Sequence, residues 1–270
     1  MNRKDIALAL SLSLLVLALS LTISLEGLGP IVPRELRPLG ASFVQNSYNP
    51  WNASLTSLSL NVVTAIVWDY RGLDTLYETL VLFASIAATL VVLRGYSELS
   101  GLGIKGLSDV SKSVTVVIAP LIVVYGIATA IHGHLTPGGG FQGGTIAVVA
   151  ATLIIAVFSL EYLYRRGVST SRLMLLRILG LLAIILTSLS LASIGMPSNV
   201  NAYILQNMAK DDSALSMPGV LFDTPLAGSI FLYNLFEFII VFSGLTFAAM
   251  MLVLRESELE SIKEAAEVYE

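Results

Sequence analysis

Long apolar runs alternate with shorter polar stretches along this chain of 270 residues. The hydrocarbon core of a bilayer is about 30 Å thick, and a helix needs roughly 20 apolar residues to cross it. The pattern therefore predicts an all-α integral membrane protein with about six transmembrane helices. They are expected at 6–25, 76–93, 115–131, 145–160, 173–194 and 228–254.

Three shorter segments predict helices that do not cross the membrane. The apolar stretch 56–68 is too short to cross comfortably, although a seventh crossing there stays an alternative. Another short helix is expected around 203–209, in the proline-containing loop after the fifth run. The tail 255–270 holds six glutamates, with Leu259, Ile262 and Ala266 at helical spacing, and predicts a solvated C-terminal helix.

The 15 lysines and arginines indicate the orientation of the chain. With six crossings and both termini in the cytoplasm, 11 of them, Arg177 included, are expected on the inside and four on the outside. Basic residues are normally enriched on the cytoplasmic side of membrane proteins. We therefore expect a multi-pass protein of the cell membrane with cytoplasmic N- and C-termini.

Composition excludes several kinds of function. Hydrophobic residues make up 55% of the chain and charged residues 13%, against about 25% charged in soluble domains. The absence of cysteine excludes disulfides, thiolate metal sites and iron-sulfur ligation. The net charge of -4 argues against nucleic acid as a partner, and the two histidines lack metal-site spacing. We expect no cofactor, no metal centre and no catalytic residue.

The segment 132–144, HGHLTPGGGFQGG, separates the third and fourth runs. Proline has no main-chain N–H and glycine loses the most backbone entropy on ordering, so no helix is expected to run through it. Irregular backbone beside a bilayer must lie at the interface, inside protein or along a wet cavity. A plain chain reversal would also fit this spacing. The match to G-x-G-x-x-G lacks a preceding strand and does not predict a dinucleotide site.

Residues 133–144, GHLTPGGGFQGG, followed by an apolar run, resemble the signature of the B subunit of Mrp-type multisubunit sodium/proton antiporters. The same domain occurs in archaeal membrane-bound respiratory complexes, and the likeness extends more loosely over 112–254. Residues 61–78, NVVTAIVWDYRGLDTLYE, are similar to the end of the antiporter's large A subunit. In membrane-bound hydrogenase relatives that piece is a separate small subunit.

The resemblance implies a chain of four parts. Residues 1–98 correspond to the A-subunit-terminal region, with two spans and the short helix, and 99–111 form a connector. Residues 112–254 correspond to the B-subunit-like four-helix domain, and 255–270 are the acidic cytoplasmic tail.

Charged residues near or within the apolar runs are the candidates for an ion path. Asp74 and Glu78 are four residues apart and share a helix face, while Arg71 can pair with Asp74 or with Asp69. Glu237 lies inside the sixth run, where a charge costs about 2.5–3.5 kcal/mol on insertion scales. Such a residue faces either a wet path or a packing partner, for which Asn234 is the candidate.

Two histidines flank the start of the glycine-rich segment. Histidine titrates near neutral pH and can relay protons, but one at a helix end often only caps carbonyl groups. Capping is expected for His132, whereas the resemblance favours a functional or loop-shaping role for His134. The candidate ion-path residues are Glu78, Asp74, Asp69, Arg71, His134 and Glu237; the loop-shaping residues are Pro137, Gly138, Gly139, Gly140, Phe141, Gly143 and Gly144.

The resemblance implies a non-catalytic membrane subunit that helps to form the path for Na⁺ and H⁺ in an antiporter module. The module either stands alone or belongs to a membrane-bound hydrogenase or related respiratory complex. The implied partners are other antiporter-module membrane subunits, hydrogenase-like or electron-transfer subunits, and the lipid bilayer. A structural linker subunit and a small self-contained transporter remain alternatives.

Overall fold

The computed structural model describes residues 3–25, 27, 35–52, 54–92 and 107–267. The chain divides into two compact units, Met1–Ser42 and Phe43–Glu270. The first unit holds α1 (Arg3–Ser24) and the start of α2 (Pro38–Ser47). The stretch Leu8–Ser24 of α1 is apolar, and its side chains are exposed around the whole helix, as expected for a helix surrounded by lipid or by another apolar surface.

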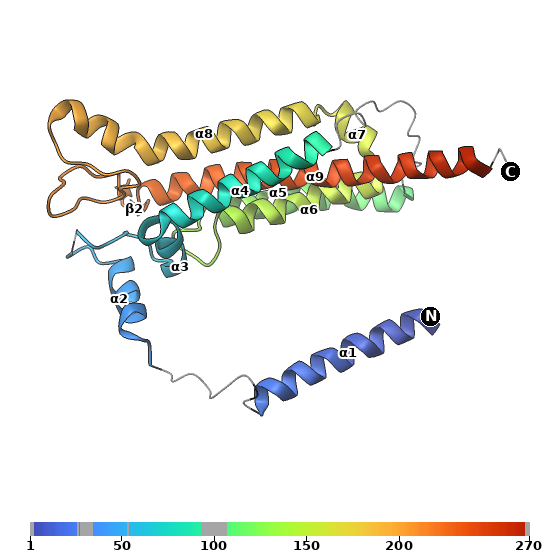
Figure 1. Cartoon of the computed structure of the whole chain (residues 1–270), viewed down its shortest axis with the longest axis horizontal. Helices are drawn as coiled ribbons and strands as arrows, with labels where there is room; N and C mark the ends of the chain where they lie inside the picture. Colours follow the sequence, from blue (N-terminus) through green and yellow to red (C-terminus); the bar gives the residue numbers. More distant parts are fainter. Residues whose placement is uncertain (1–2, 26, 28–34, 53, 93–106, 268–270) are drawn as a thin grey trace. The chain divides into compact units, whose positions relative to one another are not determined.

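The second unit is a bundle of long helices (Figure 1). Its central helix is α9 (Ser229–Glu267), which packs against four others. These are α4 (Gly72–Val92), α5 (Asp109–Ile131), α6 (Gly140–Val157) and α8 (Thr170–Gly195). The short elements are α3 (Val62–Ala65), a π-helical turn (Ile66–Tyr70), α7 (Leu160–Arg165), a 3-10 turn (Met196–Ser198) and the antiparallel strands β1 (Val220–Leu221) and β2 (Thr224–Pro225).

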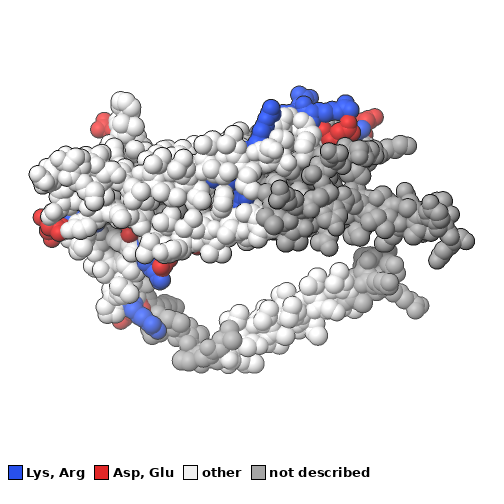
Figure 2. Space-filling view, turned by 45° about the horizontal axis from the view of Figure 1, so that its top comes forward, with Lys and Arg blue, Asp and Glu red and all other residues white. Residues whose placement is uncertain are grey.

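Four of the described helices are long and apolar enough to cross a membrane: Asp109–Ile131, Gly140–Val157, Thr170–Ser198 and Ser229–Val253. They correspond to the last four predicted spans and confirm an all-α membrane protein. On the face shown in Figure 2, the surface along the long helices is mostly uncharged, and acidic and basic side chains gather toward the helix ends. The two earlier predicted spans coincide with α1 and α4, whose membrane crossing stays a prediction.

Two predicted short helices differ from the structure. The helix expected at 56–68 begins only at Val62, because Asn61 caps it and Leu58 has a left-handed φ of 50°. It then runs through the π-helical turn to Tyr70. The helix expected around 203–209 is absent, because Leu205 has a φ of 62° and the side chain of Gln206 accepts the main-chain N–H of Tyr203 at 2.9 Å. Side chains that satisfy the backbone locally compete with helix formation.

Two further boundaries also differ. The predicted tail helix is not separate, because α9 continues from the sixth span without a break to Glu267, and 268–270 lie outside the described residues. The helix α6 starts at Gly140, so the last five residues of the glycine-rich segment are helical, contrary to the prediction. The packing around this start, described next, explains why.

Candidate functional site

The glycines at the start of α6 allow three helices to approach closely. A Cβ atom on Gly140 would lie 2.7 Å from Cβ of Glu237, and one on Gly144 would lie 2.8 Å from Cβ of Val241. On the other side of α6, a Cβ on Gly143 would lie 2.9 Å from Cβ of Ala130 in α5. These distances leave no room for a side chain. These glycines can therefore lie within a helix, because their role is to let neighbouring helices pack closely. They do not form a chain reversal.

Only one glycine in the loop before α6 requires an unusual backbone conformation. Gly138 has a φ of +139°, which L-residues rarely adopt, and a Cβ there would meet the side chain of Thr129 at 2.8 Å. Gly139 is extended and Gly140 is helical, so a positive φ does not explain the glycine at either position. Before them, His132 ends α5 and its Nδ1 lies 2.9 Å from the carbonyl oxygen of Ala128, which confirms its capping role.

The first turn of α6 is capped by side chains of α9. Its N-cap residue, Gly139, has no side chain to accept the free N–H groups. Instead, Asn234 Oδ1 accepts the N–H of Gly140 at 3.4 Å, and Glu237 Oε2 accepts the N–H of Phe141 at 3.1 Å. A carboxylate is favoured at the positive end of a helix. This contact explains how a glutamate is held within the apolar helix α9. Asn234 does not pair with Glu237; it also accepts a main-chain N–H of the first turn of α6.

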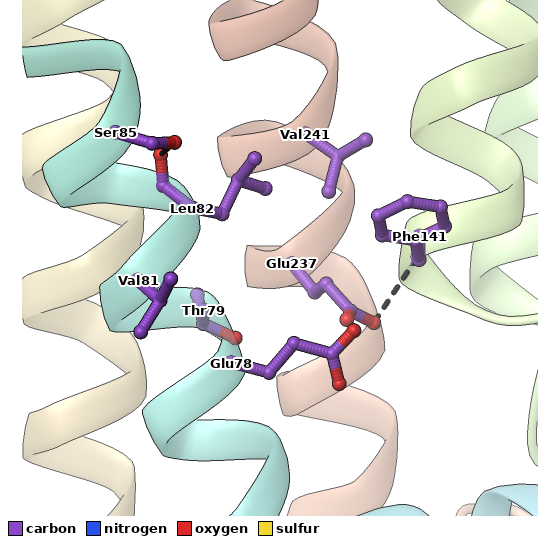
Figure 3. A pocket seen from close by; sticks show the side chains of 8 residues that line it. All are labelled: Glu78, Thr79, Val81, Leu82, Ser85, Phe141, Glu237 and Val241. Carbon is purple, nitrogen blue, oxygen red and sulfur yellow. Dashed lines mark hydrogen bonds between the residues drawn. The ribbon is translucent and has the colours of Figure 1, made fainter.

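Two neighbouring cavities, of about 270 Å³ and 200 Å³, meet at this cap. Three residues line both of them: Glu78 of α4, Phe141 of α6 and Glu237 of α9. Figure 3 shows the carboxyl groups of Glu78 and Glu237 pointing toward one another. The structure thus places together two predicted ion-path residues that are far apart in the sequence.

The smaller cavity has a polar wall. Its lining adds residues of α3, the π-helical turn, α4, the glycine loop, α6 and α9: Val63, Thr64, Val67, Trp68, Thr75, Gly138, Gly139, Gln142 and Asn234. The larger cavity extends along α4 and α9 past Thr79, Val81, Leu82, Ser85 and Val241. Among the described residues, no group of three or more histidines or carboxylates is placed to hold a metal ion. Any cation here would be shared by two carboxylates and uncharged oxygen atoms.

Arg71 and Asp74 lie outside these two cavities. They form an ion pair on the exposed start of α4, with Arg71 Nε 2.6 Å from Asp74 Oδ2. The expected pairing of Arg71 with Asp74 is therefore present, and Asp69 is not its partner. Although Asp74 and Glu78 share a helix, only Glu78 reaches the cavities.

Asp69 lies on the π-helical turn, lines neither cavity and contacts the loops at this end of the bundle. Its carboxylate accepts a hydrogen bond of 2.6 Å from Ser57 Oγ, and Lys210 and Asn207 are close enough to interact with it. Burial raises the pKa of Asp69 above its ordinary value. Because these contacts join the π-helical turn to two loops, Asp69 connects the loops at this end of the bundle.

His134 is also buried away from the two carboxylates. Its Nε2 lies 2.8 Å from the carbonyl oxygen of Pro225, to which it donates, and its ring meets Phe231 edge-on. Its Nδ1 has no hydrogen-bond partner, and burial lowers the pKa of the imidazole. This geometry ties the glycine loop to the hairpin before α9, and it places His134 outside both cavities.

Two residues not selected from the sequence have specific contacts. Asn61 Nδ2 donates to the carbonyl oxygens of Gly133 at 2.7 Å and Thr136 at 2.9 Å, so it fixes the glycine loop. An asparagine directly before an apolar run is a typical helix N-cap signal, and this signal could have identified Asn61 from the sequence. Arg177 was counted among the cytoplasmic basic residues, but it is fully buried within α8. A charged residue inside a predicted span such as 173–194 is unusual, and this position could have identified Arg177 from the sequence.

Comparisons with known proteins agree with this architecture. Residues 110–247 match the model of a domain related to the MnhB subunit of Na⁺/H⁺ antiporters. The chain is 28% identical over 229 residues to the uncharacterized protein MJ1307 of Methanocaldococcus jannaschii, which covers 78% of this chain and 83% of that protein.

Two solved structures share the fold. The Mrp complex from Dietzia sp. DQ12-45-1b contains a chain with a TM-score of 0.62 and 20% identity, matched over 93% of this chain but only 26% of the other. The archaeal membrane-bound sulfane sulfur reductase contains one with a TM-score of 0.60 and 23% identity, matched over 94% and 98%. The matched domain excludes 61–78, so the origin of that segment in an A subunit stays a prediction. Because the family model covers more than half of the sequence, the chain belongs to the family related to the MnhB subunit of Na⁺/H⁺ antiporters.

Proposed function

We propose that this chain is a non-catalytic membrane subunit of an Mrp-type cation/proton antiporter module and contributes directly to the ion path. The observation that carries this proposal is the pair Glu78 and Glu237, which face one another across two joined cavities (Figure 3). Family membership supports the antiporter module. The cavities support a path role over that of a pure linker.

The two carboxylates differ in how firmly they are held. Glu237 is fixed by the main-chain N–H of Phe141, whereas the side chain of Glu78 is exposed and forms no hydrogen bond or ion pair with another described residue. Carboxylate oxygens bind hard cations and also accept protons. Glu78 is therefore the group that exchanges Na⁺ for H⁺, and Glu237 supplies the second carboxyl group beside it.

Partner subunits would cover the apolar surface of the bundle. On α5, Leu121, Val124 and Tyr125 are exposed, each by more than 60% of its surface. Such an apolar surface is covered by lipid or by neighbouring membrane subunits. The solved relatives named above are parts of multisubunit complexes, which favours partner subunits, including those of a respiratory complex, for this chain as well.

The path role is tested with Glu237→Gln in membrane vesicles that contain the complete complex. We expect assembly on native gels with a loss of Na⁺-driven proton movement of at least about tenfold, because the amide keeps the cap but removes the charge. Glu161→Gln is the matched control, since Glu161 forms an exposed ion pair with Arg165 and lines neither cavity. Wild-type exchange by an assembled Glu237→Gln complex would favour the linker instead.

A further inference from the structure

A cavity of about 360 Å³ lies between α8 and α9 and shares no lining residue with the two cavities of the proposed ion path. It is lined by Thr170, Ser171, Met174, Leu175, Ile178 and Phe247. The first five belong to the beginning of α8 and the last belongs to α9. Positions 171, 174, 175 and 178 recur at the spacing of one helix face, so this face of α8 and the side chain of Phe247 form a groove.

The lining of this groove changes from polar to apolar along α8. Thr170 and Ser171 place hydroxyl groups at the beginning of the helix, and Met174, Leu175 and Ile178 follow within the next turns. The helix is long and apolar enough to cross a membrane, so its beginning lies near a membrane surface and the following turns lie at the depth of the lipid chains. The groove is thus polar where lipid head groups lie and apolar where their chains lie.

An exposed arginine lies at the polar end of the groove. Arg172 directly follows Ser171, and its Nη1 donates to the carbonyl oxygen of Gly167 at 2.6 Å. This bond keeps the guanidinium beside the turn that precedes α8, and it leaves most of the guanidinium donors free. No described carboxylate forms an ion pair with Arg172. The side chain can therefore bind an anion from outside the chain.

A second arginine adds to the positive charge at this end of the bundle, where Figure 2 shows basic side chains gathered. Arg166 is exposed, and its guanidinium lies over the ring of Tyr162 at 5.2 Å. It forms no ion pair with a described carboxylate, whereas Arg165 is paired with Glu161. Among the described residues, the polar end of the groove therefore carries an excess of positive charge.

The buried Arg177 does not supply charge to this groove, although it lies on the same helix. It is not one of the lining residues, and none of its surface is exposed. Its Nη2 donates to the carbonyl oxygens of Leu82 and Phe83 of α4, both at 3.3 Å, and the lack of a side chain at Gly244 leaves room for its Nε. Recognition of an anion at the groove therefore depends on the exposed arginines.

We propose that the groove between α8 and α9 binds an anionic phospholipid. Its phosphate is bound by Arg172 and Arg166 beside the hydroxyl groups of Thr170 and Ser171, and one acyl chain lies in the apolar part against Phe247. Guanidinium groups match phosphate in charge and geometry, and basic pockets between membrane helices bind anionic head groups. Because every lipid chain is as apolar as the groove, apolar contact alone selects no lipid, and the charge of the head group decides. This inference does not depend on the proposed ion path.

The test uses the complete complex in phosphatidylcholine vesicles that contain a small fraction of a photoreactive lipid. The probe is phosphatidylglycerol with a diazirine at the end of one acyl chain, and peptide mass spectrometry after illumination locates the label. We expect labelling of the segments that hold Leu175 and Phe247. The same diazirine chain on phosphatidylcholine should label them at least about fivefold less, since a basic residue near a membrane surface contributes roughly this factor for an anionic lipid.

Variants of the assembled complex separate the head group from the chain. Arg172→Gln should reduce labelling by the phosphatidylglycerol probe about fivefold. Lys112→Gln is the matched control, because Lys112 is a basic residue near the start of α5 and does not line the groove. Leu175→Trp, which fills the groove without a change of charge, should reduce labelling of the Phe247 segment. Leu179→Trp should not, because Leu179 is similarly exposed on α8 but lies outside the groove.

Equal labelling by the two probes in the wild-type complex would overturn the inference, because the groove would then hold bulk lipid without recognising its charge. Unchanged labelling in an assembled Arg172→Gln complex would also contradict it. If Arg172→Gln does not assemble, the comparison of the two probes on the wild-type complex still decides.

Discussion

The main-chain N–H of Phe141 donates a hydrogen bond of 3.1 Å to the carboxylate of Glu237. This contact joins the glycine motif of α6 to the middle of α9, and it exists only because Gly140 lets the two helices touch. The motif and the acidic residue of the sixth span therefore form one site.

Substitution of Gly140 should disrupt this site without removing any ionisable group. A methyl group there would overlap α9 near Glu237, and overpacking of this kind typically costs about 1–3 kcal/mol. We expect Gly140→Ala to lower the thermal stability of the assembled complex, measured by the loss of its native-gel band on heating. Gly72→Ala is the matched control, because its nearest neighbour would lie at an ordinary 3.7 Å. Equal stability of the two variants would show that the close approach is not required.

Asn61→Asp should destabilise the glycine loop while it keeps the helix cap of α3. The retained oxygen still accepts the N–H groups of the first turn, but the second oxygen would face the carbonyls of Gly133 and Thr136 that Nδ2 now satisfies. One of these hydrogen bonds is partly buried and the other exposed, so their loss costs about 0.5–1.5 kcal/mol each. The melting temperature in detergent should therefore fall at least as far for Asn61→Asp as for Asn61→Ala. A wild-type melting temperature for Asn61→Asp would contradict this prediction and would show that Asn61 stabilises the fold through the helix cap alone.

The stability of the complex should fall in mild acid through His134. Burial lowers the pKa of this imidazole in the fold, so the unfolded chain binds more protons below the ordinary histidine pKa of about 6.5. The stabilising contribution of the neutral ring is complete above that value and is lost as the pH falls toward the lowered pKa.

His134→Gln can still donate to Pro225 but does not titrate. We expect its melting temperature to depend less on pH between about 7 and 5 than that of the wild type. His132→Gln is the control, since His132 is exposed at the end of α5. Parallel curves for His134→Gln and the wild type would contradict this explanation.

Hydropathy could predict the long helices because a bilayer demands unbroken apolar runs, and it placed Glu237 in the centre of one. The resemblance of 133–144 gave the family, which the matched domain confirms. Periodicity could not predict that α6 begins at Gly140, because the reason is contact with residues almost 100 positions later. Nor could it predict that Asp69 and His134 lie outside the cavities that Glu78 lines, since spacing along the chain does not fix which side of a turn faces a cavity.

The same limit explains Arg177. Counting basic residues for orientation treats every arginine as a loop charge, whereas this one reaches from α8 to the carbonyl oxygens of α4. The space beside Gly244 and the acceptors of Leu82 and Phe83 arise only from tertiary packing. A sequence pattern can mark such a residue as unusual, but it cannot supply its contacts.

The central claim is that Glu78 exchanges Na⁺ for H⁺ in the cavity it shares with Glu237, and transport by Glu78 variants tests it most directly. Na⁺-driven proton movement should be recorded in vesicles holding the assembled complex, from about pH 6 to about pH 9. Glu78→Gln should reduce exchange at least about tenfold at every pH, and Glu78→Asp should retain part of it, because only the aspartate keeps a titratable carboxylate. Wild-type exchange by an assembled Glu78→Gln complex across this range would contradict the account.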